Sequence, residues 1–332
     1  MGLIVGWDPI KIGIDPEIAH WGGLLLTWHG VFVAIGIALG VWVAVKMAAR
    51  AGFIEDDSYT IALVGVATGI VGARVLFVAE NHSLFEGRLL DIFRINEGGI
   101  SIYGALIGGV LGAILYNELG LMVFAPVISP IMFIWVLLRR GLRGPRVALG
   151  SALGAVRMLL RRGPGAPRLP IRAGLDAAAF GMILGQGIGR IGDIINGEHF
   201  AKTTDLPWAV IYTHASSPSF GLAPQHPAVA YEFLGDLLIF GLLFLFWRFY
   251  KRDGLVFFSY AFLYSAMRMG TSALRLDNQV LWEFKMAQVI ALVVIAISIL
   301  GFAYCLRQAP GRRKAEAALA PTPAVGRAQA RR

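Results

Sequence analysis

The sequence predicts an all-α membrane protein built as a bundle of about seven transmembrane helices. Of its 332 residues, 57% are hydrophobic and only 15% are charged, whereas soluble domains contain about 25% charged residues. The mean hydropathy is +0.66. Several apolar runs reach the roughly 20 residues that a helix needs to cross a bilayer core of about 30 Å. These observations indicate a polytopic protein that is integral to the membrane.

The apolar runs define the predicted spans in chain order. One further run, Leu121–Leu138, is interrupted by Pro126 and Pro130, so a span, a re-entrant segment and an interfacial helix are all open for it. The seven predicted spans are 23–45, 60–79, 100–116, 174–195, 229–249, 255–274 and 284–306.

Arginine-rich segments predict the orientation, because cytoplasmic loops carry an excess of Lys and Arg. The interval 119–172 holds nine arginines and no acidic residue, and 307–332 holds seven basic residues and one acid. We therefore expect a transmembrane domain over 1–306 with a cytoplasmic or interfacial insert at 119–172. The polar segment 196–225 and the N-terminus should lie outside, and a disordered basic tail over 307–332 in the cytoplasm. The net charge of +9 then reflects topology and not nucleic-acid binding.

In this orientation, the charged residues within the spans gather at the outer ends of the helices. Arg190 and Asp193 are three residues apart on a helix, so they share a face and can pair. Arg268, Ser272 and Arg275 have the spacing of one face of another helix. A charge at bilayer depth costs roughly 2.5–3.5 kcal/mol on insertion scales, so such residues usually face a polar cavity.

Three arginines at one site favour a bound phosphate, because guanidinium groups match phosphate oxygens bidentately. Structural roles are the alternatives for the other polar residues in the spans. Arg74 alone is equally consistent with a structural ion pair, and His29 alone with a hydrogen-bonded interface histidine. Glu232 and Asp236 could hold helices together.

Six blocks of sequence occur in an order that is informative as a set. The most specific is GRIGDIINGEHFAKTTDLPWAVIYTH, which begins at Gly189. The others are WHGVFVAIG, GARVLFV, GGISIYGALIGG, HPAVAYE and YSAMRMGTSALRLDN. Together they resemble the phosphatidylglycerol–prolipoprotein diacylglyceryl transferases, over residues 20–305 without the insert and the tail.

The resemblance implies an activity and a location. The activity is transfer of the diacylglyceryl group from phosphatidylglycerol to the lipobox cysteine thiol of a prolipoprotein signal peptide, with release of glycerol phosphate. The location is the bacterial inner membrane, with seven spans, a small periplasmic head, the N-terminus outside and the C-terminus in the cytoplasm. The resemblance implies no metal and no cofactor. Cys305 is the single cysteine, which excludes disulfides within the chain and cysteine-ligated metal sites.

Residues that match the family's motifs carry its expected roles. Arg190 and Arg268 match two essential arginines that would hold the lipid phosphate. Glu198 belongs to the NGE of the signature, and His226 to a block similar to HPSQLYE. The residues expected to contact phosphatidylglycerol are Arg190, Arg268, Asp193, Asn196, Arg275, His29 and Tyr231.

The chain also departs from the family's pattern. Asp193 stands where many members carry asparagine, and His29 occupies the place of a tyrosine. Ser272 replaces a glutamate, Ala201 replaces a glycine, and Tyr103 stands where the family often has a histidine. These departures leave the two arginines intact and leave the proton acceptor open.

The attacking thiol must lose its proton, since the thiolate is the nucleophile and free cysteine has a pKa of about 8.5. The candidate catalytic bases are Glu198, His226 and Tyr103. We favour His226 or Glu198, because tyrosine, with a pKa of about 10, is the poorest acceptor near neutrality.

Two other functions would use the same residues. A transporter for an anionic lipid would bind it with the same arginines and perform no chemistry. The sequence has no visible internal repeat, which weighs against a transporter built from inverted halves. A non-catalytic relative that binds lipid or lipoprotein precursors is favoured only by the departures at Tyr103 and Ser272. The order of the six blocks favours the transferase.

Overall fold

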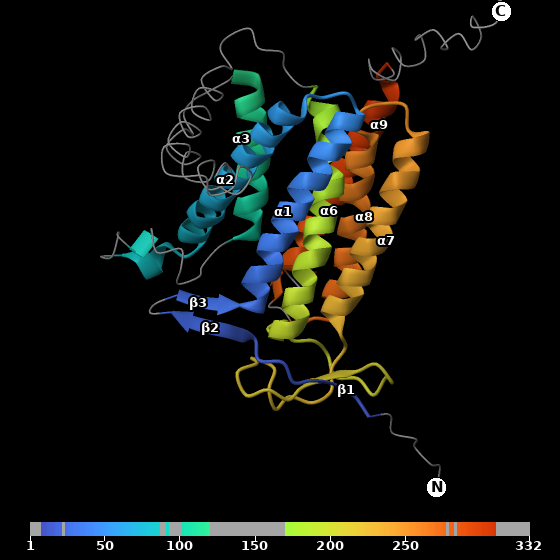
Figure 1. Ribbon diagram of the computed structural model, residues 1–332. Helices are drawn as coiled ribbons and strands as arrows, with labels where there is room; N and C mark the ends of the chain where they lie inside the picture. Colours follow the sequence, from blue (N-terminus) through green and yellow to red (C-terminus); the bar gives the residue numbers. More distant parts are fainter. Residues whose placement is uncertain are drawn as a thin grey trace, which may run out of the picture. The chain divides into compact units, whose positions relative to one another are not determined.

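The computed structural model describes residues 8–21, 24–86, 91–92, 101–119, 170–276, 279–281 and 284–309. Most of these residues lie in seven α-helices (Figure 1). Within the described residues, four helices are long and apolar enough to cross a membrane, so the prediction of an all-α polytopic membrane protein is confirmed. The four are α1 (Trp28–Arg50), α2 (Glu55–Glu80), α7 (Ala228–Phe249) and α9 (Met286–Arg307).

The other helices are α3 (Ile102–Leu119), α6 (Ile171–Asn196) and α8 (Leu255–Ser272), and a 3₁₀ helix, η1, covers His82–Phe85. Each predicted span overlaps one α-helix. The start predicted at residue 23 is wrong, because the residues before Trp28 form a strand and the helix begins after it. Most of the predicted insert at 119–172 and of the tail at 307–332 lies outside the described residues, as does all of Leu121–Leu138.

Short strands pair two by two beside the helices. They are β1 (Ile10–Ile12) with β4 (Val210–Tyr212), β2 (Glu17–Trp21) with β3 (Leu24–Thr27), and β5 (Gln279–Leu281) with β6 (Phe284–Lys285). The pair β1–β4 is parallel and places Ile10 opposite Val210.

The chain divides into two compact units. The first unit contains the described parts of Met1–Trp21, Leu25–Gly40 and Arg172–Arg332, and therefore helices α6 to α9 and the first half of α1. The second contains the described parts of Gly22–Leu24 and Val41–Ile171, and therefore the rest of α1 with α2 and α3.

In the first unit, glycines bring α1 and α6 into backbone contact (Figure 1). A Cβ atom added to Gly36 would lie 2.7 Å from the carbonyl oxygen of Gly185, and one added to Gly40 would lie 2.6 Å from that of Gly181. At Gly192 a Cβ would lie 2.7 Å from the Cα of His29. Small residues permit this close approach of helices in a membrane, and here it brings the start of α1 against the end of α6.

At its opposite end, α6 is tied to α8 through Asp176. The buried Asp176 carboxylate accepts hydrogen bonds from the backbone N–H groups of Gly254 and Phe257, both at 2.8 Å. These N–H groups belong to the first turn of α8, where no intrahelical acceptor is available. Asp176 therefore caps α8 and fixes the two helices to each other at this level.

The segment after α6 folds back onto the end of that helix. Tyr212 donates a hydrogen bond to the carbonyl of Ile194 (2.9 Å), and the Ser217 hydroxyl donates to the carbonyl of Asn196 (3.1 Å). Gly197 has φ +71°, and a Cβ there would meet the Ser217 hydroxyl and the ring of Tyr212. Only glycine fits this turn, and the predicted head segment 196–225 is anchored through it.

The second unit contains a helix pair of similar construction. Helices α2 and α3 approach through glycines, and a Cβ added to Gly69 would lie 3.1 Å from the carbonyl oxygen of Ala105. Arg74 on α2 is buried, and its guanidinium donates to the carbonyls of Asp91 (2.6 Å) and Ile92 (2.7 Å). Through these two hydrogen bonds Arg74 ties the segment at residues 91–92 to α2 within the second unit.

Candidate active site

Four helix ends of the first unit meet at the candidate site. They are the start of α1, the end of α6, the start of α7 and the end of α8. The polar side chains that they bring together are His29 from α1, Arg190 and Asp193 from α6, Glu232 from α7, and Arg268 and Thr271 from α8.

Glu232 is the centre of this group. Its side chain is 0% exposed, and Arg190 Nη2 lies 3.0 Å from its Oε2. Its other oxygen, Oε1, pairs with Arg268 and accepts a hydrogen bond from the Thr271 hydroxyl at 3.0 Å. Arg275 Nη1 lies 3.9 Å from the same oxygen. A single buried carboxylate thus orients guanidinium groups from three positions of the chain.

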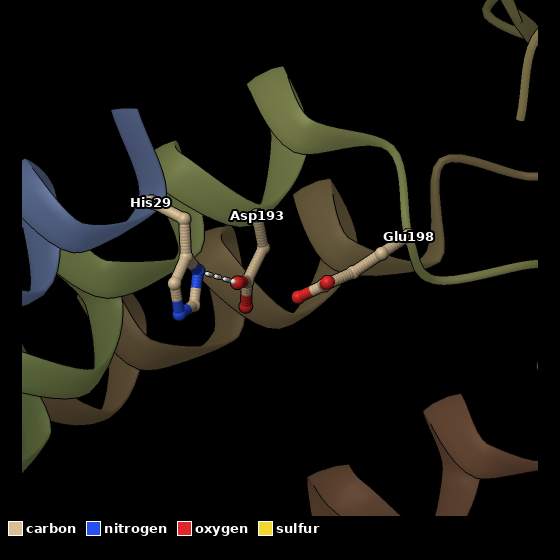
Figure 2. Close-up of side chains that lie close together, drawn as sticks. All are labelled: His29, Asp193 and Glu198. Atoms are coloured by element: carbon tan, nitrogen blue, oxygen red, sulfur yellow. Dashed lines mark ion pairs between the residues drawn. The ribbon is translucent and has the colours of Figure 1, made fainter. Parts of the chain in front are cut away.

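Asp193 forms a second centre beside Arg190. Its Oδ2 accepts a hydrogen bond from Arg190 Nη1 at 2.9 Å, so the predicted pairing of these two residues is confirmed. Its Oδ1 lies 2.7 Å from His29 Nδ1, the ion pair drawn in Figure 2. The Nε2 of His199, in the segment that follows α6, lies 3.4 Å from Oδ2.

The predicted position of Arg275 on a face of α8 is wrong. The helix ends at Ser272, and Arg275 follows in a turn. The Lys285 ammonium group donates to the backbone carbonyls of Ser272 (2.6 Å) and Arg275, which satisfies acceptors that the helix leaves open at its end. The Arg275 guanidinium donates instead to His199 Nδ1, at 2.9 Å.

The remaining predicted residues lie around the cluster or apart from it. The Glu198 side chain is 42% exposed, with its carboxylate 4.0 Å from His199 Nε2. His226 and Tyr231 form a separate group, in which the Tyr231 hydroxyl lies 3.5 Å from His226 Nδ1 and accepts from Trp208 Nε1 at 2.7 Å. Tyr103 belongs to α3 in the second unit, and its side chain lies outside the described residues.

Asn196 is the last residue of α6, and its backbone carbonyl is the acceptor for Ser217 described above. Tyr212, outside the membrane-spanning segments, is buried against the same helix end. Burial, together with the nearby negative charge of Asp193, raises the pKa of Tyr212 to about 12. Its phenol therefore stays a hydrogen-bond donor at neutral pH.

His29, Asp193 and Glu198 place one ligand atom each within 4.8 Å of one another, a composition that could hold a metal ion (Figure 2). However, Arg190 already donates to the Asp193 carboxylate, and a guanidinium so close opposes the binding of a cation. We assign no metal to this group, and the expectation of a metal-free site stays a prediction.

Several site residues could not be predicted from helical spacing. His199 and Lys285 lie just outside helices, where no periodicity relates them to the other residues. The central position of Glu232 depends on which face of α7 meets α6 and α8. Thr271 had a usable signal, because it lies three residues after Arg268 on one helix.

Fold and site together define an integral membrane protein with a buried arginine–carboxylate cluster at one end of a helical bundle. The family model described as prolipoprotein diacylglyceryl transferase matches residues 16–141 and 147–304. The chain therefore belongs to this family, as the resemblance of the six blocks implied.

Curated relatives support this assignment. The chain is 29% identical over 282 residues to the phosphatidylglycerol–prolipoprotein diacylglyceryl transferase of Clostridioides difficile, covering 85% of this chain and 92% of the relative. It is 30% identical over 293 residues to the enzyme of that name in Acaryochloris marina. This alignment covers 87% of this chain and 90% of the relative. It is 29% identical to the enzyme of that name in Thermotoga maritima, and this alignment covers 88% of this chain and 85% of the relative.

Proposed function

We propose that this chain is a membrane transferase that moves the diacylglyceryl group of phosphatidylglycerol to the lipobox cysteine thiol of a prolipoprotein. The product is a thioether, glycerol phosphate is released, and the step begins lipoprotein maturation. The observation that carries the proposal is the cluster in which Arg190 and Arg268 are held by the buried Glu232.

The cluster suits the leaving group of this reaction. Three guanidinium groups contact the carboxylates of Asp193 and Glu232, and the buried Asp236 is a further acidic neighbour of Arg190 and Arg268. Since each guanidinium has five N–H donors, the three arginines retain donors for an additional anion. As the carbon–oxygen bond to phosphate breaks, negative charge grows on the phosphate oxygens. Donors that are already oriented stabilise such charge without reorganisation, and most strongly where water is excluded. We assign this role to Arg190 and Arg268.

We assign supporting roles to the remaining predicted residues of the first unit. We place Asn196, Tyr231 and Arg275 at the border of the lipid headgroup, with Glu198 and His226 among the candidates for proton transfer. No cofactor is required, because the charge is stabilised by the protein's own guanidinium groups.

The distribution of basic residues supports an orientation in the bacterial inner membrane. Arg248, Arg252 and Arg307 lie at the ends of helices opposite to the cluster. Because basic residues favour the cytoplasm, we propose that the cluster and the segment 196–225 face the periplasm, with the N-terminus outside and the C-terminus inside. Labelling of cysteines introduced at Lys251 and Lys202 by an impermeant reagent in spheroplasts tests this, since only the cysteine at 202 should react.

A reconstituted transfer assay tests the activity. Purified protein, phosphatidylglycerol vesicles and a lipobox peptide should give the mass increment of a diacylglyceryl group on the peptide cysteine. Phosphatidylcholine vesicles are the lipid control. Arg248→Ala is the protein control, because Arg248 is an exposed arginine in the last turn of α7, the helix that carries Glu232.

Folded protein that gives no increment with phosphatidylglycerol would refute the proposed activity. Binding of phosphatidylglycerol vesicles without transfer would identify the chain as a lipid-binding relative instead.

A further inference from the structure

A chain of close contacts runs through the site from Arg275 to His29. Arg275 Nη2 lies 2.9 Å from His199 Nδ1, His199 Nε2 lies 3.4 Å from Asp193 Oδ2, and Asp193 Oδ1 lies 2.7 Å from His29 Nδ1. We infer that His29 Nε2 accepts the proton of the substrate thiol, with Asp193 and His199 as its positioning residues. The inference rests on the transferase function proposed above.

The first contact determines the tautomer of His199. Arginine has donors and no acceptor, so the nitrogen of His199 that faces Arg275 must be the acceptor. In neutral His199 the proton is therefore on Nε2, the nitrogen that faces Asp193. His199 thus presents an N–H group to the carboxylate.

The neighbours of His29 likewise determine which of its ring nitrogens carries the proton. Asp193 Oδ2 already accepts from Arg190, and a carboxylate between a guanidinium and an imidazole N–H stays ionised. His29 Nδ1 lies 2.7 Å from Asp193 Oδ1 as an ion pair, without the angle of a hydrogen bond. Because a bare imidazole nitrogen so close to an ionised carboxylate oxygen would be repelled, the proton of His29 is on Nδ1. Its other nitrogen, Nε2, is then left with a lone pair, and it is turned away from Asp193 (Figure 2). A carboxylate behind Nδ1 that leaves Nε2 as base is the arrangement of a catalytic histidine.

The location of His29 also fits the role. Its side chain is 40% exposed, whereas that of Asp193 is 7% exposed, so a substrate can reach the ring but not the carboxylate behind it. Asp193 binds both His29 and Arg190, which places the proton acceptor next to the arginine assigned to the phosphate. Gly192 permits this, because a Cβ there would lie 2.7 Å from the His29 Cα.

The other candidate bases are less well arranged. The Glu198 carboxylate is 42% exposed, and a solvated carboxylate is a far weaker base than imidazole toward a thiol. His226 belongs to the separate group with Tyr231. The charged groups that face His29 are Arg190 and Asp193 from α6 and Glu198 from the segment after it. His29 is a departure from the family pattern, and so is Asp193, its partner.

The thiol proton moves to His29 Nε2, and the thiolate sulfur attacks the glyceryl carbon that carries the phosphate. The sulfur–carbon bond forms, the carbon–oxygen bond breaks, and its electron pair remains on the phosphate of the departing glycerol phosphate. His29 then passes its proton to solvent or to that phosphate.

The test compares His29→Gln with a matched control in the transfer assay. His20→Gln is the control, because His20 also pairs with a carboxylate, Glu17, at 2.7 Å, but on the exposed surface. His29→Gln should lower kcat at pH 7 by about 100-fold, the contribution typical of a general base. The KM for phosphatidylglycerol should stay near the wild-type value, and His20→Gln should behave like the wild type.

Two further readouts distinguish a base from a structural residue. The deficit of His29→Gln should shrink as the pH rises above about 8.5, because the thiol then ionises without help. Imidazole in the buffer should restore part of the activity of His29→Ala. His199→Gln and Asp193→Asn should lower kcat in the same direction with the same pH dependence.

The outcomes separate the two proposals. If the wild type transfers the lipid and His29→Gln has the wild-type rate at pH 7, the inference is wrong and the transferase function stands. A deficit that is constant with pH and not rescued by imidazole also overturns the inference. If the wild type transfers nothing, the proposed function fails and the role of His29 fails with it.

Discussion

Arg74, which is buried, and Arg190, whose side chain is 12% exposed, both occur in helices that pack through glycines, yet their surroundings differ. Arg74 donates to the backbone carbonyls of Asp91 and Ile92, and its guanidinium carbon lies 5.4 Å from the centre of the Phe85 ring. Arg190 pairs with the carboxylates of Asp193 and Glu232.

The difference shows that an arginine in an apolar helix is not evidence of a site by itself. The contacts of Arg74 with these carbonyls and with the Phe85 ring tie the segment at residues 91–92 to α2, within one unit. Carboxylates held between three guanidinium groups form a charged cluster, and an anionic ligand can change the balance of positive and negative charge in it. The two arginines therefore differ in their surroundings, and we propose a functional role only for Arg190, which shares the carboxylate of Glu232 with other arginines, whereas hydropathy treats both positions alike.

The largest expected effect comes from replacing each arginine by lysine, which keeps the charge and removes the planar fork. Arg190→Lys should lower the transfer rate by about 10²–10³-fold, the loss typical of a donor to transition-state charge, with little change in melting temperature. Arg74→Lys should lower the melting temperature in detergent and leave the rate per folded molecule unchanged. If both variants lose stability and keep their transfer rate, Arg190 and Arg74 have the same kind of role and the distinction between them is wrong.

The next effect concerns two glutamates, one in each unit. Glu232→Ala leaves three arginines without their central carboxylate and should destabilise the protein by about 3–5 kcal/mol, as expected for breaking a buried pair. Glu55 pairs with Lys46 at 2.8 Å on the surface, and Glu55→Ala should cost less than about 1 kcal/mol. Thermal melts in detergent measure both. Equal shifts would show that Glu232 is not the centre of the cluster.

Glycine variants probe the two helix pairs at a smaller scale. In the second unit a Cβ added to Gly72 would clash with the carbonyl oxygen of Gly104. Gly72→Ala there and Gly192→Ala in the first unit should each cost about 1–3 kcal/mol through overpacking. Only Gly192→Ala should also reduce transfer, because it moves His29 away from Asp193. Gly241→Ala is the control, since nothing lies within 4 Å of an added Cβ at that position. A normal transfer rate for Gly192→Ala would contradict the assigned spacing.

The smallest effect concerns Tyr212, which anchors the end of α6. Tyr212→Phe removes the hydrogen bond to Ile194 and should cost about 1 kcal/mol at neutral pH. Burial raises the pKa of Tyr212 to about 12 in the folded protein, against about 10 in the unfolded chain.

The unfolded chain therefore loses the phenolic proton of Tyr212 first as the pH rises. The contribution of Tyr212 to the free energy of unfolding is therefore full below pH 10 and falls between pH 10 and 12. Melting temperatures of wild type and Tyr212→Phe, compared across this range, measure the effect. A wild-type curve that parallels that of the variant would mean that the Tyr212 phenol is not buried as described.

Much of this architecture could be predicted from the sequence. Hydropathy located seven helices, and the three-residue spacing of Arg190 and Asp193 predicted their pair, because both follow from the chain's local period. The role of His199 could not be predicted, since it lies beyond the end of α6, where the backbone turns at Gly197. Arg275 was placed on the face of α8 by its spacing, but the helix ends three residues earlier. Hydropathy also could not show that His29 and Asp193 meet, because their contact depends on the packing of α1 against α6.

Because Asp176 caps the start of α8, it fixes one common level from which the distances of Arg190 and Arg268 along their helices can be counted. Arg190 is fourteen residues after Asp176, and Arg268 is fourteen residues after Gly254, the residue that Asp176 binds. At 1.5 Å per residue, both guanidinium-bearing positions stand about 21 Å from the same level. Deleting one residue from either helix would lower one arginine by about 1.5 Å and rotate it by about 100°. The alignment of the proposed phosphate site is therefore set at the opposite ends of α6 and α8 from the site itself.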